Sequence, residues 1–205
     1  MVGIVNYGSG NVYAIANLHK SANIDFFVSG NPMDLKKASH LILPGVGAFD
    51  STMNTLNKLG LYDYLNEEVL IAKKPIIGIC VGMQILGESS EEGNQNGFGW
   101  IKGKIKKIPT QSLMQKPLLP HLGWNSIEII NNKSNLFNNI DNKKGFYFLH
   151  SYYFEPTAEI DILAKTSYGL NFCSAINHEN VFGLQFHPEK SHTNGINIFK
   201  NFSKI

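Results

Sequence analysis

The chain has 205 residues, of which 43% are hydrophobic and 17% charged, and this composition suffices for one well-filled core. The formal net charge is +2, and all 18 basic residues are lysine. Because arginine is the residue preferred for bidentate phosphate recognition, its absence argues against an extensive nucleic-acid site, and we expect no nucleic-acid partner.

The two cysteines, Cys80 and Cys173, are too few for a disulfide framework, so a reducing compartment is expected. The N-terminus has no basic segment followed by an apolar core, which is the pattern of a signal peptide. No apolar run approaches the length of about 18 residues that a membrane-spanning helix needs. We therefore expect a cytoplasmic protein with no membrane partner.

The first half of the chain alternates between two patterns. Short continuous apolar runs indicate buried strands, and apolar residues at helical spacing indicate helices between them. Such alternation is typical of a parallel sheet covered on both faces. The expected strands are 2–7, 24–29, 40–45 and 75–80, and the expected helices are 10–21, 49–73 with a break near Gly60, and one that begins at 81.

The second half has a different pattern, because strand-like stretches follow one another with turn residues between them. They are 103–108, 123–130, 145–155, 161–169, 172–180 and 181–191, and a last helix is expected over 193–204. The Asn/Lys-rich segment 131–144 predicts an exposed loop around a short helical turn. We expect one domain, 1–205, of the α/β class: a mostly parallel central sheet flanked by helices, with antiparallel strand additions in the second half.

Cys80 stands between two glycines at the junction of an apolar strand and a helix, in Gly78-Ile79-Cys80-Val81-Gly82. This is the nucleophile-elbow pattern, in which a tight turn projects the central side chain above the carboxyl end of the sheet. The N-terminus of the following helix would favour the thiolate, and the N–H of Val81 could serve an oxyanion. The alternative is that Cys80 is a small buried hydrophobic residue.

A thiol nucleophile needs a base, and His187 is the strongest candidate among the seven histidines. It follows an apolar strand that Pro188 ends, and Glu189 lies two residues further on, where its carboxylate can orient the imidazole. The alternative is a turn histidine beside a solvated glutamate. Of the others, His121 and His150 have apolar neighbours and could be buried.

A glycine-rich turn, Gly45-Val46-Gly47, follows the expected strand 40–45. Its conformational freedom would let backbone N–H groups point into a cleft, as an oxyanion hole requires. The alternative is an ordinary turn. No His or Cys spacing typical of a metal site is present, so we expect no metal and no cofactor.

Taken together, these motifs resemble the signatures of class I glutamine amidotransferases, which use a Cys-His-Glu triad. Three further stretches make the chain similar to the glutaminase subunits of imidazole glycerol phosphate synthases, over about the full length of those subunits. The six motifs are 78–84, 44–49 and 185–189 for the class, and 6–11, 121–125 and 147–153 for the subunits.

The resemblance implies a reaction and a set of roles. Cys80 would attack the side-chain amide carbon of glutamine, His187 would move the protons, and Glu189 would orient His187. The oxyanion would be held by Val81 and by the Gly45-Val46-Gly47 turn. The residues implied to line the glutamine site are Gly82, Gln84, Ser151 and Tyr152.

The resemblance also implies a partner, a (β/α)₈-barrel synthase subunit that receives ammonia and makes imidazole glycerol phosphate and AICAR in histidine biosynthesis. Asn11, His121, Trp124 and Asn125 would lie at the interface. Three alternatives stay open: a paralogous glutaminase that supplies another synthase, such as one amidating a surface sugar; a stand-alone cysteine hydrolase of γ-glutamyl substrates; and a non-catalytic regulator. Cys173 is expected to be a buried strand residue.

Overall fold

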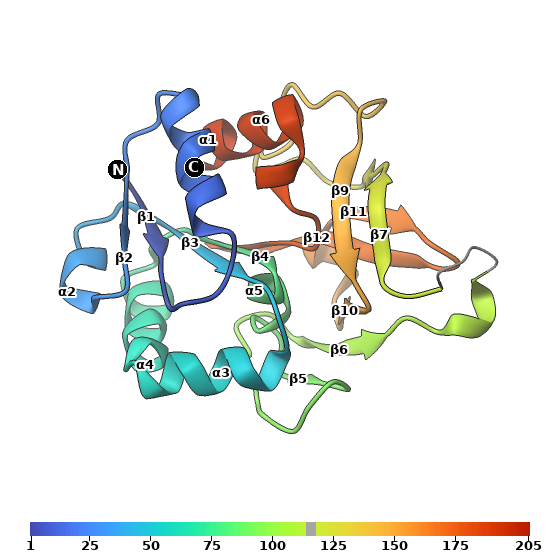
Figure 1. Cartoon of the computed structure of the whole chain (residues 1–205), viewed down its shortest axis with the longest axis horizontal. Helices are drawn as coiled ribbons and strands as arrows, with labels where there is room; N and C mark the ends of the chain where they lie inside the picture. The colour runs from blue at the N-terminus through green and yellow to red at the C-terminus, as the bar shows by residue number, and fades with distance from the viewer. Residues whose placement is uncertain (114–117) are drawn as a thin grey trace.

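The computed structural model of the chain describes residues 1–113 and 118–205. Its main sheet has the strand order β2-β1-β3-β4-β13-β12-β10-β6-β5, with β11 paired to β12 and β8, and a second sheet consists of β7 and β9 (Figure 1). The strands are β1 Val2–Val5, β2 Phe26–Ser29, β3 His40–Gly45, β4 Ile76–Cys80, β5 Ser89–Ser90, β6 Gly103–Lys107, β7 His121–Asn125, β8 Glu128–Ile129, β9 Phe146–His150, β10 Tyr152–Pro156, β11 Ile162–Ser167, β12 Asn171–His178 and β13 Val181–Leu184.

Five neighbouring strands, β2, β1, β3, β4 and β13, pair in parallel, and the strands beyond them, β12, β10 and β6, are antiparallel. Every residue of β1, β4 and β13 is buried, because helices cover both faces of the parallel half (Figure 1). The helices are α1 Val12–Ser21, α2 Pro32–Leu35, α3 Phe49–Lys58, α4 Leu61–Asn66, α5 Val81–Gln84 and α6 His192–Phe202, with a π-helical turn at Glu67–Ile71 and 3₁₀ turns at Thr110–Ser112, Glu159–Asp161 and Pro188–Lys190.

The predicted fold class is confirmed: the sheet is mostly parallel where the sequence alternates between strands and helices, and antiparallel in the second half. The expected break of the long helix occurs at Gly60, whose φ of 68° is left-handed. Within the described residues, no helix is long and apolar enough to cross a membrane.

Several predicted boundaries were wrong. The stretch 145–155 forms two strands, β9 and β10, which belong to different sheets and meet at Ser151. The stretch 123–130 likewise splits into β7 and β8. Segment 131–144 forms turns, but it is not exposed throughout, because Leu136 and Phe137 are buried. Asn201 on α6 donates to the carbonyl oxygens of Leu136 and Asn138 in this segment. The helix after Cys80, α5, has four residues, so the dipole available to the thiol is small.

The turn from β4 into α5 is packed so closely that glycine is required on both sides of Cys80. A Cβ atom on Gly82 would lie 2.0 Å from the carbonyl oxygen of Leu43, and one on Gly78 would lie 2.3 Å from the carbonyl oxygen of Gly82. Neither carbonyl can move without distorting the sheet or the turn. The glycines therefore let α5 lie directly against β3 and β4.

Gly82→Ala should lower the free energy of unfolding by about 2 kcal/mol or more, because overpacking a close-packed site costs about 1–3 kcal/mol. Gly60→Ala is the matched control: it has open space around its Cβ and should cost only the left-handed strain of about 1 kcal/mol. Urea denaturation of both variants measures the difference. An equal or smaller loss for Gly82→Ala would contradict the close approach.

Candidate active site

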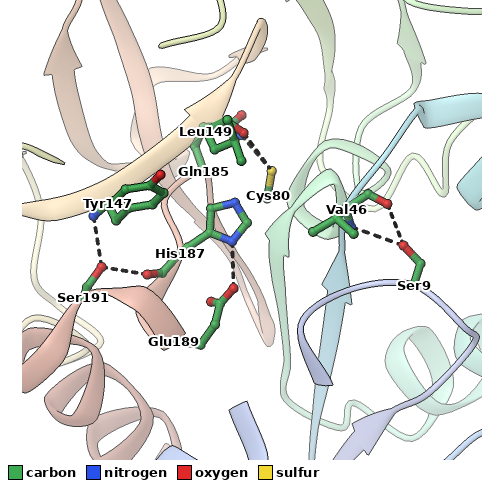
Figure 2. Close-up of polar contacts among 9 residues, drawn as sticks. All are labelled: Ser9, Val46, Cys80, Tyr147, Leu149, Gln185, His187, Glu189 and Ser191. Carbon is green, nitrogen blue, oxygen red and sulfur yellow. Dashed lines mark hydrogen bonds and ion pairs between the residues drawn. The ribbon is translucent and has the colours of Figure 1, made fainter. Parts of the chain in front are cut away.

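Cys80 is the last residue of β4 and has φ 56° and ψ −113°, a left-handed φ that L-residues rarely adopt. The thiol is buried, and its Sγ atom lies 3.7 Å from the carbonyl oxygen of Leu149 (Figure 2). Gly45, at the end of β3, is the register partner of Cys80. The strained turn and the glycine-rich turn therefore meet at one edge of the sheet, as the motifs predicted.

His187 follows β13, the other neighbour of β4, and its imidazole lies between Cys80 and Glu189 (Figure 2). Its Nδ1 is 2.8 Å from Oε1 of Glu189, and the two side chains are 3% and 1% exposed. A carboxylate accepts, so Nδ1 donates and Nε2 faces the thiol. Nε2 is buried and has no hydrogen-bond partner within the described residues. The three residues thus have the arrangement of a nucleophile, a base and an orienting acid.

The surroundings of His187 favour its protonated form. Burial on its own would lower the pKa of His187, but its interactions with Cys80 and Glu189 outweigh burial and raise this pKa to about 10. An imidazole in this position can hold a proton taken from the thiol. It can then deliver that proton to a leaving group.

A cavity of about 260 Å³ opens beside the thiol. It gathers residues from β4, α5, the turn after β3 and the break between β9 and β10. Among the residues singled out from the sequence, its lining includes Val46, Gly47, Cys80, Val81, Gln84, Ser151, Tyr152 and His187. Glu189 lies behind His187, and Gly45 and Gly82 lie in the backbone beneath the turn.

Gln84 is buried, and both hydrogens of its amide nitrogen are used within the protein. Nε2 donates to the carbonyl oxygen of Tyr152 at 3.0 Å and to Oε1 of Gln185 at 3.1 Å. Gln185 in turn donates from Nε2 to Cys80 Sγ at 3.8 Å. A ligand contact by Gln84 therefore falls to its Oε1. Sequence reasoning missed Gln185, although it stands two residues before His187.

Glu92 also lines the cavity and was missed from the sequence. Its Oε2 accepts the backbone N–H of Phe49 at 2.7 Å, which holds the carboxylate at the start of α3. In the sequence it is one of two adjacent glutamates in a polar segment, and nothing distinguishes it from Glu91. Only the fold brings this carboxylate to the cavity, where it can pair with an ammonium group.

The peptide group of Val46 is engaged by Ser9 from the loop after β1. Ser9 Oγ donates to the carbonyl oxygen of Val46 at 2.6 Å and accepts from its N–H at 3.3 Å (Figure 2). The hydroxyl of Tyr7 donates to the carbonyl oxygen of Pro44, two residues before Val46, at 2.6 Å. The Val46 N–H, expected at the oxyanion hole, is thus bound elsewhere in this conformation.

The four residues expected at a partner interface differ in exposure, and Leu122, which was not singled out from the sequence, lies beside them. Leu122 and Trp124 project from one face of β7 and are 60% and 48% exposed. Trp124 stacks on His192 with 5.2 Å between ring centroids. His121 points to the opposite face and is 3% exposed, so it offers no surface to a partner. Asn11 and Asn125 are partly buried.

His121 pairs with His150 inside the small sheet. Nδ1 of His121 lies 3.0 Å from Nε2 of His150, and Nδ1 of His150 lies 2.7 Å from the carbonyl oxygen of Tyr152. Burial lowers the pKa of His121 to about 4. Burial, together with the charge of His121, lowers the pKa of His150 to about 3. Both imidazoles are therefore neutral at physiological pH.

A strained cysteine beside a buried His-Glu pair, on an α/β sheet, is the arrangement that the resemblance to class I glutamine amidotransferases implies. The family model "Glutamine amidotransferase class-I" matches residues 4–205, and the chain belongs to this family. It is a glutamine amidotransferase, and a cysteine nucleophile is typical of such enzymes.

Within the family, the chain is similar to proteins named imidazole glycerol phosphate synthase subunit HisH. Those of Leptospira interrogans and Bdellovibrio bacteriovorus are 44% and 43% identical to it over 205 residues, which cover 100% of this chain and 100% of each relative. The glutaminase-subunit resemblance is thereby confirmed.

Solved structures support the fold independently. A structure titled "Structure of PurLQS from Thermotoga maritima" has a TM-score of 0.74 with 17% identity, and the match covers 99% of this chain and 96% of that one. "Crystal structure of glutamine amidotransferase" gives the same TM-score with 16% identity, over 100% of this chain and 99% of that one.

The lowered pKa values of His121 and His150 predict an acid-sensitive contribution to stability. In the unfolded chain both imidazoles bind a proton below about pH 6.5. In the folded protein they stay neutral until the pH falls to about 4 for His121 and about 3 for His150. Their contribution is complete above pH 6.5 and is lost as the pH falls. Urea unfolding across this window should show a smaller pH slope for His121→Asn than for the unmodified chain. Identical slopes would contradict the neutral pair.

Proposed function

We propose that the chain hydrolyses glutamine to glutamate and ammonia, with Cys80 as nucleophile, His187 as acid and base, and Glu189 as the group that orients His187. The observation that carries the proposal is the buried, unpartnered Nε2 of His187, which faces Cys80 at the wall of the cavity.

The reaction follows from this geometry. Sγ of Cys80 attacks the side-chain amide carbon of glutamine, and the thiol proton passes to Nε2 of His187. The carbon–nitrogen bond breaks as His187 returns a proton to the departing ammonia. A water molecule, deprotonated by His187, then cleaves the γ-glutamyl thioester and regenerates the thiol.

Glutamine would be held by groups that match its two ends. Glu92 is the anionic group in the lining that can pair with the α-ammonium, and Oε1 of Gln84 can accept a further hydrogen bond. Ser151 and Tyr152 close the opposite wall. The narrow volume, about 260 Å³, suits a ligand of amino-acid size.

The oxyanion would be held by the N–H of Val81 and by the turn Gly45-Val46-Gly47. For Val46 to contribute, its peptide group must leave Ser9, because its N–H is now donated to that hydroxyl. Full activity therefore needs a change in this turn, and a bound partner is the natural source of it. This favours a partner-dependent glutaminase over a stand-alone hydrolase.

The partner we propose is a (β/α)₈-barrel synthase subunit, which would use the ammonia to make imidazole glycerol phosphate and AICAR in histidine biosynthesis in the cytoplasm. The names of the relatives support this assignment. Exposed apolar side chains, Val46, Leu122 and Trp124, supply contact area of the kind that anchors interfaces, and Asn11 and Asn125 are proposed at its border.

The first test is glutamate release by the chain with and without the barrel subunit and its phosphoribosyl-formimino substrate. Cys80→Ala should reduce the release by about 10³-fold or more, and Glu189→Gln by about 10²-fold or more, because the triad works as a unit. Cys173→Ala is the matched control: it replaces a buried strand cysteine that has no role in the proposed mechanism, and it should retain activity. Retained release by Cys80→Ala in the complex would disprove the mechanism.

Adding the barrel subunit with and without the nucleotide distinguishes between the possible acceptors of the ammonia. Strong stimulation that requires both the partner and the nucleotide supports the histidine-pathway assignment. Stimulation by the partner alone, with indifference to the nucleotide, would overturn that assignment and point to another acceptor.

Ser9→Ala tests the restraint on Val46. Removing the hydroxyl frees the Val46 peptide group, and partner-independent glutamate release should rise roughly two- to tenfold, since one hydrogen bond contributes about 0.5–1.5 kcal/mol. Release by the assembled complex should change little. Ser21→Ala, which removes a surface hydroxyl bonded to Leu18 on α1, is the control. Unchanged basal release by Ser9→Ala would show that Ser9 does not restrain the turn.

A further inference from the structure

A series of hydrogen bonds connects β7 to the thiol of Cys80. It has two halves, and both end on the same backbone carbonyl group. The carbonyl oxygen of Tyr152 accepts from Nδ1 of His150 at 2.7 Å and from Nε2 of Gln84 at 3.0 Å. On the first side the series continues to His121 and Asn125. On the second side it continues through Gln185 to Cys80.

The direction of every bond on the histidine side is determined by that carbonyl group. A carbonyl oxygen only accepts, so Nδ1 of His150 carries the hydrogen and Nε2, in the neutral ring, accepts. Nδ1 of His121 must then donate, which leaves its own Nε2 as an acceptor. Asn125 supplies the donor, because its Nδ2 lies 3.2 Å from His121 Nε2.

The remaining atoms of Asn125 confirm its orientation. Its Nδ2 also donates to the carbonyl oxygen of Ser167 at 3.0 Å, and its Oδ1 accepts the N–H of Ser126 at 2.8 Å. Rotating the amide would break both of these bonds. The set therefore has one self-consistent arrangement, in which both imidazoles are neutral and protonated on Nδ1.

An added proton on either ring would place two N–H donors opposite each other with no acceptor between them. Protonated His150 would direct a second N–H at the N–H of His121, and protonated His121 would direct one at the amide of Asn125. This agrees with the lowered pKa values of the two rings. Besides His121, the titratable group of the described residues that acts on His150 through its charge is His187, and its positive form also disfavours a proton there.

The pair lies where the fold needs a restraint. His150 ends β9 and Tyr152 begins β10, so the chain changes sheets at Ser151, which lines the cavity. His121 is the cross-strand partner of His150. Its ring is stacked against Phe148 and Tyr168, with centroids 4.7 Å and 4.1 Å away. The Ser151–Tyr152 wall is thus restrained by His121 on β7, a residue that does not line the cavity.

We infer that His121 and His150 are positioning residues: as a neutral donor–acceptor pair they hold the Ser151–Tyr152 wall and, through Gln84 and Gln185, set the distance from that wall to the thiol. The inference deepens the proposed function, on which it rests for the identity of glutamine as ligand. His150 itself lines the cavity, whereas His121 does not and acts on it only through His150. Substitution of His121 therefore changes how well glutamine is held rather than the chemical step.

Two substitutions of His121 separate its hydrogen bonds from its packing. His121→Phe keeps an aromatic ring between Phe148 and Tyr168 but removes both nitrogens. His121→Asn removes the ring but keeps a donor near the position of Nδ1. In the assembled complex, His121→Phe should raise KM for glutamine roughly tenfold, while His121→Asn stays within about threefold of the unmodified enzyme, because a buried acceptor left unpaired is costly.

In both variants kcat should change by less than about threefold, since the triad is untouched. The opposite order, with His121→Phe normal and His121→Asn impaired, would show that the ring matters only by packing and would overturn the inference. So would equal losses in kcat for both variants. His40→Phe, a partly buried ring against Phe202, controls for the loss of a histidine elsewhere and should keep the unmodified KM.

A measurement independent of glutamine turnover separates the inference from the proposed function. Long-range ¹H–¹⁵N spectra of the histidine-labelled protein should show His121 and His150 neutral at physiological pH, each with its hydrogen on Nδ1. Alkylation of Cys80 by iodoacetamide should change in rate in His121→Phe and not in His121→Asn. An Nε2–H or charged form of either ring in the unmodified chain would overturn the inference.

If the unmodified complex released no glutamate, the proposed function would fail. The positioning role would then be decided by the tautomers and the alkylation rates alone.

Discussion

The parallel pairing of β3, β4 and β13 is the constraint on which the site depends. The carboxyl ends of parallel strands meet at one edge of a sheet, so the turn after β3, the elbow after β4 and the histidine after β13 converge. The register places Gly45 beside Cys80 and Leu184 beside Ile79. Two strands more than a hundred residues apart in sequence thereby bring the thiol of Cys80 and the imidazole of His187 together.

Much of this edge could be predicted because its determinants are local in sequence. The apolar run before Cys80 and the glycines on either side specify a strand and a tight turn. The apolar run before His187 predicted its strand as well, but the expected end at Pro188 was wrong, because β13 ends at Leu184. The break at Ser151 could not be predicted, because the run 145–155 is apolar and strand-like throughout. Its two halves part only because β9 pairs with β7 while β10 pairs with β6 and β12.

The same limit applies to Glu92, which lines the cavity, and to Gln185, which contacts the thiol, because sequence patterns assigned neither of them a role. Glu92 is brought to the cavity by a contact with Phe49, more than forty residues away in the sequence. Gln185 gains its role from Gln84 and Cys80, which lie about a hundred residues earlier. No pattern within a short window carries such contacts. The oxyanion turn is the intermediate case: its composition predicted a flexible turn, but its hydrogen bond to Ser9 depends on the packing of the loop after β1.

The site contains two kinds of histidine, and the acceptor on Nδ1 distinguishes them. Burial alone would lower the pKa of His187, but its interactions with Cys80 and with the carboxylate of Glu189 at Nδ1 raise this pKa to about 10. His150 faces the uncharged carbonyl group of Tyr152 on one side and the ring of His121 on the other, and its pKa is lowered to about 3. A positive His187 lowers the pKa of His150 further. The two rings therefore favour opposite protonation states. This difference is what the proposed mechanism requires, because a neutral His150 can support the wall of the cavity without competing with His187 for the thiol proton.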